Sequence, residues 1–306
     1  MKKIAISTTS FAKFDVAPLE ECRNAGYEIL CNPHGRKVTT EEILDLARDA
    51  QGLIAGTELL TRDVIKKLST LKVISRCGTG LDNVDREAAK EFGIKVFNTP
   101  DAPTQAVAEL TIGLMLSCLR FISQADRCIR SGQWQKPMGK LLQSKTVGII
   151  GYGRIGRAVS RLVAAFGADV LAFDIADVSG EGSAKMVDFD FLIASSDIIT
   201  LHMPPSTSKK AVITDKVISK MKQGTCLINA SRGGLVDEEA LYEALRSNKL
   251  GCAALDVFEK EPYKGNLTKC DNIVLTTHIG SYARESRILM EKQAVANLLK
   301  GLEVNK

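Results

Sequence analysis

Polar side chains follow three successive strand-like runs in the second half of the chain. Arg232 comes just after residues 225–230, several carboxylates come after 251–256, and His278 comes after 272–276. In an open parallel sheet, ligands bind beyond the carboxyl ends of the strands. A guanidinium can hold an anion there, a carboxylate can pair with a histidine, and the histidine can carry a proton near neutral pH. The three segments together therefore predict acid–base chemistry on an anionic ligand.

A second candidate site is the glycine motif at residues 151–156. Gly151, Gly153 and Gly156 have the spacing Gly-x-Gly-x-x-Gly, directly after the expected strand 146–150 and at the start of a helical pattern. In dinucleotide-binding folds the first glycine permits a tight turn, the second lets the backbone approach a pyrophosphate, and the third lets the helix pack close to the strand. The pyrophosphate then lies at the helix N-terminus, where unpaired N–H groups favour negative charge. The motif predicts a dinucleotide cofactor; the alternative is a fortuitous strand, turn and helix.

Asp174 indicates which nicotinamide dinucleotide is bound. It ends the next expected strand, residues 169–174, and lies 18 residues after Gly156. A carboxylate at this place accepts hydrogen bonds from ribose hydroxyls and repels the 2′-phosphate that distinguishes NADP. Residues 175–178 contain no arginine or lysine that could bind that phosphate. We therefore expect NAD as the cofactor.

Short β-branched runs alternate with helix-length segments along the whole chain, which is the pattern of parallel βαβ units and an α/β fold. Two series of runs occur, and they predict two doubly wound parallel sheets. The series are joined without a linker, through residues 98–103 and an apolar helix at 104–120 that either lies in a domain core or partly contacts another subunit. An amphipathic helix at 283–302 can return to the first domain. The expected strands are 3–7, 27–31, 52–56, 71–77 and 95–98, then 146–150, 169–174, 198–202, 225–230, 251–256 and 272–276.

The composition is that of a globular protein. The 306 residues are 45% hydrophobic and 25% charged, and this length suggests about two domains. The formal net charge is only +5, and the chain has no run of three lysines or arginines. Because nucleic-acid-binding proteins usually concentrate basic residues on one face, we do not expect a nucleic-acid partner. A small anionic ligand remains compatible with this charge.

Membrane insertion, export and metal binding are not expected either. The longest run of apolar or small residues, 110–119, is half of the roughly 20 residues that a spanning helix needs. Residues 1–10 lack the apolar core of a signal peptide, so a cytoplasmic location is expected. The eight cysteines include no Cys-x-x-Cys pair and only three histidines occur, so we expect free thiols and no zinc site.

Four motifs follow one another in the order of a known family. The glycine motif precedes Ser-Arg-Gly-Gly-Leu-Val-Asp at 231–237, Leu-Asp-Val-Phe-Glu-Lys-Glu-Pro at 255–262 and Thr-His-Ile-Gly at 277–280. A further motif, Arg-Cys-Gly-Thr-Gly-Leu-Asp-Asn-Val-Asp, occupies residues 76–85. With these motifs the chain resembles the D-isomer-specific 2-hydroxyacid dehydrogenases, and the phosphoglycerate dehydrogenase branch in particular. The resemblance covers essentially the whole chain.

The resemblance implies a particular domain arrangement. A Rossmann NAD-binding domain, residues 102–282, would be inserted in a flavodoxin-like substrate domain made of residues 1–101 and 283–306. Members of the family are commonly dimers, so a homodimer is expected.

The family's catalytic residues match Arg232, Glu261 and His278. The resemblance implies that His278 gives a proton to the ketone oxygen of a 2-oxo acid while hydride passes between the nicotinamide and the same carbon, and that it acts as a base in the reverse direction. Glu261 would hydrogen-bond to the imidazole and favour its charged form. Arg232 would hold the carboxylate or the 2-oxygen of the substrate through its planar guanidinium.

The resemblance also implies binding residues in both domains. Arg76, Cys77, Gly78 and Thr79 would bind the substrate together with Arg232, with backbone N–H groups of the 77–79 segment holding the carboxylate. Cys77 is expected to be a small apolar residue rather than a nucleophile. His202 is expected to line the cofactor cleft or to be structural. The implied cofactor contacts are Thr79, Gly151, Gly153, Arg154, Ile155, Gly156, Asp174, Met203, Ala230, Arg232, Asp256, His278 and Gly280.

The residues after the third expected strand bear on the substrate. In the phosphoglycerate branch this strand ends in a Val-Arg-Ser-like triplet whose arginine helps to bind the substrate phosphate, whereas here Gly56 takes the arginine's place and Glu58 follows. Arg62, Arg76 or a partner subunit could supply the missing cation. The expected substrate is a small anionic 2-hydroxy or 2-oxo acid: 3-phosphoglycerate, hydroxypyruvate or glyoxylate. An NAD-sensing corepressor-like binding protein is the alternative from another functional class.

Overall fold

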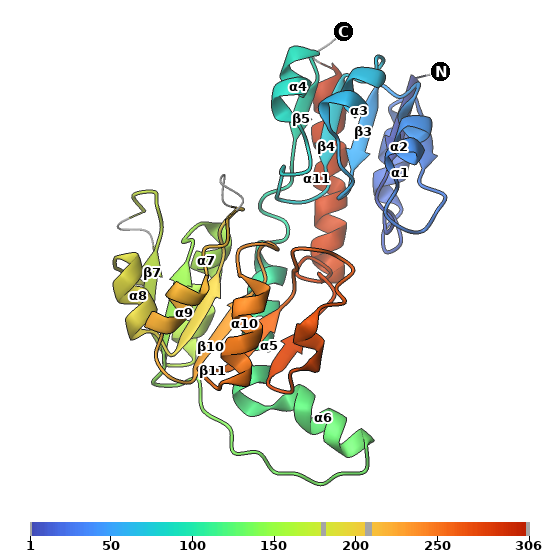
Figure 1. Cartoon of the computed structure of the whole chain (residues 1–306). Coiled ribbons are helices and arrows are strands. Elements are labelled where there is room, and N and C mark those ends of the chain that lie inside the picture. The colour runs from blue at the N-terminus through green and yellow to red at the C-terminus, as the bar shows by residue number, and fades with distance from the viewer. Residues whose placement is uncertain (1, 179–181, 206–209, 304–306) are drawn as a thin grey trace. The chain divides into compact units, whose positions relative to one another are not determined.

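The chain folds into two compact α/β units (Figure 1). Unit 1 comprises Met1–Pro103 and Ser281–Lys306, and unit 2 comprises Thr104–Gly280. The chain therefore passes between the units after Pro103 and after Gly280, two residues from each of the expected crossings after residues 101 and 282. The computed structural model describes residues 2–178, 182–205 and 210–303.

Unit 1 contains a five-stranded parallel sheet in the order β2-β1-β3-β4-β5. The chain winds outward in both directions from the β1/β3 pair, which is the doubly wound arrangement. All five expected strands form, with ends within two residues of the prediction. The strands are β1 Lys2–Ile6, β2 Tyr27–Cys31, β3 Gly52–Ala55, β4 Val73–Arg76 and β5 Lys95–Phe97, and the helices are α1 Ala17–Asn24, α2 Thr40–Ala47, α3 Arg62–Lys67, α4 Arg86–Glu91 and α11 Arg284–Glu303.

Two apolar clusters cover the two faces of the unit 1 sheet. On one face, Ile4 and Val73 pack with Leu298 of α11, the long C-terminal helix in Figure 1. On the other face, Ala5 and Ile74 pack with residues of α2, α3 and α4. Since neighbouring residues of one strand point to opposite faces, both faces of these buried strands need apolar side chains. The continuous β-branched runs in the sequence have this cause.

Unit 2 contains a seven-stranded parallel sheet in the order β12-β11-β10-β9-β6-β7-β8. The six expected strands form with ends within one residue of the prediction, whereas the two-residue edge strand β8 is too short to give a sequence signal. The strands are β6 Thr146–Ile150, β7 Asp169–Phe173, β8 Lys185–Met186, β9 Ile198–Leu201, β10 Thr225–Asn229, β11 Leu250–Leu255 and β12 Ile273–Leu275. The helices are α5 Thr104–Arg120, α6 Ile122–Arg130, α7 Arg154–Ala165, α8 Phe189–Ser195, α9 Asp215–Lys220 and α10 Glu238–Arg246, with a 3₁₀ turn, η1, at Asn266–Lys269.

Helix α5 lies in the core of unit 2. Its Ala108 and Met115 are fully buried and pack in one cluster with Val147 of β6 and Val159 of α7. This agrees with the core alternative for the apolar segment. Within the described ranges, no single helix is long and apolar enough to cross a membrane; α5 and α6 pass that test only as a pair, by length and composition, and they are bent by 63° at Phe121.

Candidate active site

The glycine motif forms a tight turn between β6 and α7. Gly151 has a φ of +92°, and a Cβ at this position would lie 2.5 Å from the carbonyl oxygen of His202. A Cβ on Gly156 would lie 2.2 Å from the carbonyl oxygen of Gly151. Both positions therefore exclude a side chain, and the start of α7 lies directly against the end of β6.

Gly153 differs from the other two glycines because open space lies where a side chain would point. Apart from Gly153 and its two chain neighbours, no protein atom lies within 4 Å of the place that a Cβ would occupy, and Gly153 starts α7 without a side-chain cap. The positive end of the α7 dipole therefore faces a space into which an anionic group can enter. This geometry fits the pyrophosphate of a dinucleotide. The turn also lies at the centre of the sheet, where strand order reverses between β6 and β9.

Asp174 follows β7, and its carboxylate is hydrogen-bonded to the backbone of the glycine turn. One carboxylate oxygen accepts a hydrogen bond from the Tyr152 N–H at 2.7 Å, and the other accepts one from the Ala176 N–H at 2.9 Å. These bonds fix the carboxylate in orientation. Each oxygen keeps a lone pair that a ribose hydroxyl can use.

His202 is a support of the glycine turn. Its backbone N–H donates to the Ile150 carbonyl oxygen at 2.7 Å, and its Nε2 lies 2.9 Å from the Thr200 hydroxyl. Burial lowers the pKa of His202 to about 3, so the imidazole is neutral near pH 7. This histidine is therefore unsuited to carry the proton of the reaction. Met203, the next residue, is half-buried and packs on the unit 2 core.

His278 and Glu261 form a direct pair in unit 2. His278 Nδ1 and Glu261 Oε2 are 3.0 Å apart, and the other oxygen of Glu261 accepts a hydrogen bond from the Phe258 N–H at 3.2 Å. The side chain of His278 is 45% exposed and that of Glu261 is 39% exposed. Because Nδ1 faces the carboxylate, Nε2 is the ring nitrogen that a substrate oxygen can reach.

Asp256 holds the turn that carries His278. One of its carboxylate oxygens accepts from the Thr276 hydroxyl at 2.6 Å and from the Ile279 N–H at 2.8 Å, and the other accepts from the Gly280 N–H at 2.8 Å. His278, in the middle of this turn, has a φ of +57°. The side chain of Asp256 is 0% exposed. The buried carboxylate of Asp256 therefore positions the turn that carries His278, and the expected cofactor contact of Asp256 stays a prediction.

Arg232 lies in the loop after β10, and Asn229 fixes that loop. The Asn229 side chain donates to the Arg232 carbonyl oxygen at 2.9 Å and accepts from the Ser231 N–H at 3.1 Å. A Cβ on Gly233 would lie 1.8 Å from the Phe258 carbonyl oxygen, so the arginine loop touches the backbone of the glutamate loop. Since β10, β11 and β12 are neighbours in the sheet, their carboxyl ends bring the three catalytic candidates to one edge of unit 2. Ala230, between Asn229 and Ser231, is buried.

The predicted substrate loop of unit 1 has a more constrained backbone than the sequence indicates. The Arg76 guanidinium lies over Gly78, whose φ is +152°, and donates to the Cys77 carbonyl oxygen at 3.0 Å. The Cys77 N–H donates to the carbonyl oxygen of Ala55 at the end of β3, and the Gly78 N–H donates to the Arg76 carbonyl oxygen. A sheet bond therefore already uses the Cys77 N–H, and the expected binding of a carboxylate by the 77–79 segment stays a prediction. Burial raises the pKa of the Cys77 thiol to about 11, as expected for a residue that is not a nucleophile.

A buried carboxylate lies at the end of β3. Glu58 is 3% exposed, and its two oxygens lie 3.1 Å from the Gly56 N–H, which donates to them. The Ser7 hydroxyl also donates to Glu58. Arg62, one of the expected substitutes for the missing cation, is instead paired with Glu91 at 2.7 Å. The sequence indicated the acidic residue at this place but not its burial.

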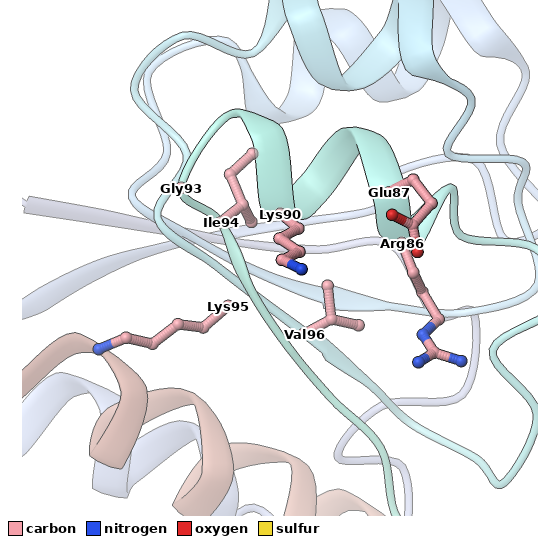
Figure 2. A pocket seen from close by; sticks show the side chains of 7 residues that line it. All are labelled: Arg86, Glu87, Lys90, Gly93, Ile94, Lys95 and Val96. Atoms are coloured by element: carbon pink, nitrogen blue, oxygen red, sulfur yellow. The ribbon is translucent and has the colours of Figure 1, made fainter.

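A pocket of unit 1 lies apart from all these residues. It is formed around α4 and the start of β5, at the amino end of the strands, and it contains none of the predicted site residues. Figure 2 shows that Arg86 and Lys95 carry their charges toward opposite sides of it, so the two cations do not converge on one ligand position. The lining residues are Arg86, Glu87, Lys90, Gly93, Ile94, Lys95 and Val96.

Comparison with known proteins decides the family. Residues 112–280 match the family model of the D-isomer-specific 2-hydroxyacid dehydrogenase, NAD-binding domain. The chain belongs to this family. Its cofactor is therefore NAD, and unit 2 contains the cofactor domain.

Relatives of this dehydrogenase differ in their substrates. It is 39% identical to the hydroxypyruvate reductase of Thermotoga maritima over 289 residues, which cover 90% of this chain and 94% of the reductase. It is 44% identical to the D-3-phosphoglycerate dehydrogenase of Methanocaldococcus jannaschii over 259 residues, which cover 82% of this chain but only 49% of that protein. The crystal structure of the TT0316 protein from Thermus thermophilus matches with a TM-score of 0.91 at 34% identity, over 99% of this chain and 97% of the other.

Proposed function

We propose that this dehydrogenase interconverts a short 2-oxo acid and its D-2-hydroxy acid, with hydroxypyruvate or glyoxylate preferred to a phosphorylated substrate. The observation that carries the reaction type is the 3.0 Å contact between His278 Nδ1 and Glu261. The carboxylate orients the histidine at the edge of the nucleotide-binding sheet. There the imidazole can exchange a proton with a substrate whose carbon exchanges hydride with the nicotinamide.

Each catalytic residue has a separate task in the proposed reduction. The glycine turn and Asp174 would hold NADH, which would supply the hydride for the 2-carbon. His278 donates the proton from Nε2 to the ketone oxygen, and Glu261 stabilises the imidazolium before transfer. Arg232 binds the substrate carboxylate, because a planar guanidinium can make two parallel hydrogen bonds to it. In the reverse direction His278 accepts the hydroxyl proton.

Glu58 supports the choice of an uncharged substrate tail. In the phosphoglycerate branch, an arginine that helps to bind the phosphate occupies the position of Gly56. Here a buried carboxylate lies beside that position, and a Cβ on Gly56 would already lie 3.0 Å from a Glu58 oxygen. A phosphate dianion near a buried carboxylate is disfavoured by charge repulsion. The nearly full-length relative from Thermotoga maritima, a hydroxypyruvate reductase, supports the same choice.

A panel of substrates tests the proposal. NADH absorbance is followed with glyoxylate, hydroxypyruvate and phosphohydroxypyruvate, and we expect kcat/KM to be highest for one of the two unphosphorylated acids. A preference for phosphohydroxypyruvate would refute the argument from Glu58. Tight NADH binding without turnover of any 2-oxo acid would favour an NAD-sensing binding protein instead.

We also propose that the protein is a homodimer. Helix α6 and the segment after it carry exposed apolar side chains: Ile122 is 55% exposed, Ile129 60%, Trp134 79%, Met138 91% and Leu141 64%. Apolar side chains gathered in one short stretch are typical of a protein contact surface. We expect light scattering to give the mass of two chains, and a Trp134→Ser, Met138→Ser double variant to shift it toward one chain. A monomeric wild-type protein would contradict this proposal.

A further inference from the structure

Three cysteines that are far apart in the sequence meet in unit 2. Cys118 lies on α5, Cys226 on β10 and Cys252 on β11, and their Sγ atoms all lie within 4.8 Å of one another. Cys226 and Cys252 are register partners on adjacent parallel strands. The Cys118 thiol, on the helix that covers this face, donates to the Ala253 carbonyl oxygen at 3.2 Å. The sheet register and the helix packing together create this cluster.

Lys140 contributes a positive charge that acts on Cys252. The backbone N–H of Lys140 donates to the Leu119 carbonyl oxygen at 2.9 Å, which holds Lys140 next to the end of α5. The three sulfurs of the cluster are therefore accompanied by one lysine charge.

We propose that Cys118, Cys226 and Cys252 form a binding site for a divalent thiophilic metal ion of the Zn²⁺ and Cd²⁺ class. Thiolates are the ligands that soft metal ions prefer. Three sulfurs at about 2.3 Å from a tetrahedral ion lie about 3.8 Å apart, so small side-chain rotations bring the observed cluster to this geometry. The sequence-based expectation of no metal site rested on short spacings and did not consider cysteines from three separate elements.

The charge of the site favours a divalent ion. Three thiolates and a divalent ion carry one net negative charge, and the Lys140 ammonium offsets it. A monovalent ion would leave a net charge in surroundings where Cys118 and Cys226 are buried, which is costly. Among the residues that the structure describes, no fourth His, Cys, Asp or Glu joins the cluster. Part-exposed Cys252 provides the side from which the ion and a water ligand can enter.

The metal site lies away from the catalytic edge of unit 2. Cys226 and Cys252 are near the amino ends of their strands, whereas Arg232 and Glu261 follow the carboxyl ends. Cys226 is three residue steps from Asn229, the last residue of β10, which corresponds to about 10 Å. Bound metal would tie α5 to β10 and β11 and stabilise unit 2 by mass action.

Cadmium titration of the reduced, metal-free full-length chain tests the site. The ultraviolet charge-transfer band between sulfur and cadmium reports thiolate binding, and we expect saturation at one ion per chain. Cys252→Ala should abolish the band. Cys128→Ala and Cys270→Ala are matched controls, since both cysteines are part-exposed in the same unit but lie outside the cluster. A band that persists in Cys252→Ala, or one that a control variant removes, would overturn the proposal.

A second measurement uses the wild-type chain and so does not depend on variants that fold. Cysteines are alkylated with and without Cd²⁺ in unfolding conditions that trap each thiol as it becomes accessible, and the labelled peptides are identified by mass spectrometry. We expect Cd²⁺ to slow labelling of Cys118, Cys226 and Cys252 together by more than about 10-fold and to leave the other cysteines unchanged. Protection of none, or of a different set, would refute the site. Lys140→Gln should weaken Cd²⁺ binding a few-fold; unchanged affinity would refute the charge argument.

Discussion

The buried carboxylate of Asp256 provides the sharpest test of how the active site is held together. It is 0% exposed and accepts three hydrogen bonds, from the Thr276 hydroxyl and from the backbone N–H groups of Ile279 and Gly280. Asp256→Asn keeps the size of the side chain but replaces one acceptor oxygen by an NH₂ group. In either amide orientation, at least one of the three donors then faces another donor.

The expected effect on stability can be worked from these bonds. A hydrogen bond to a charged group contributes about 1.5–3 kcal/mol, and a buried donor without an acceptor costs about 1–3 kcal/mol. We therefore expect Asp256→Asn to lower the free energy of unfolding by about 2–4 kcal/mol. Asp169→Asn is the matched control, since Asp169 begins β7 and is exposed, and it should change stability by less than about 0.5 kcal/mol.

Catalysis should suffer separately from stability. The turn released by Asp256→Asn carries His278, whose φ of +57° is held by these bonds. A shift of about 1 Å in a catalytic group can cost about 10²-fold in rate, so we expect kcat to fall by about that factor at a temperature where the variant is still folded. Urea unfolding and NADH absorbance measure the two quantities. A variant that is destabilised but keeps the wild-type kcat would refute the positioning role, and one unchanged in both would refute the whole argument.

Replacing His278 by Ala removes the proton carrier, so kcat should fall by at least about 10²-fold. The affinity for NADH, measured by fluorescence titration, should stay unchanged. Normal turnover of the variant would contradict the role of His278. Gly153→Ala adds a methyl group where no protein atom beyond its chain neighbours lies within 4 Å, whereas at Gly156 it would lie 2.2 Å from the Gly151 carbonyl oxygen. We expect both variants to lose NADH affinity but only Gly156→Ala to lower the urea midpoint, and the reverse pattern would refute the assigned roles. Burial lowers the pKa of His202 to about 3, so below about pH 6.5 the unfolded state binds a proton that the folded state does not. The free energy of unfolding should then fall by about 2 kcal/mol from pH 7 to pH 5. His202→Asn should remove this pH dependence. An equally strong pH dependence in the variant would exclude His202 as its cause.

The local pattern of apolar residues was sufficient to predict the positions of most strands. Helix α5 spans the predicted residues Thr104–Arg120, and the predicted strands differ from the observed ones by at most two residues at either end. Parallel strands buried on both faces produce continuous apolar runs that are visible without knowledge of their partners. Strand β8 and helix α6 were not predicted, because β8 has two residues and α6 has none that is buried.

The residue types of the active site were also readable from the sequence. The glycine spacing depends on a local turn, and the residues that follow β10, β11 and β12 lie at one edge because parallel strands align their carboxyl ends. The motif order pointed to Arg232, Glu261 and His278 as the catalytic candidates. Their chemistry therefore follows from residue type and chain order.

Contacts between distant segments were decided only by the tertiary structure. The Asp256 carboxylate accepts donors that lie 20 to 24 residues further along the chain. Cys118 meets two strands that start more than 100 residues later. Glu58 accepts a hydrogen bond from Ser7, 51 residues earlier. Sequence spacing carries no signal for such pairs, because each depends on how separate elements pack and on which groups are removed from water. The sequence by itself determined which groups could react, whereas packing decided which of them are fixed, buried or brought together.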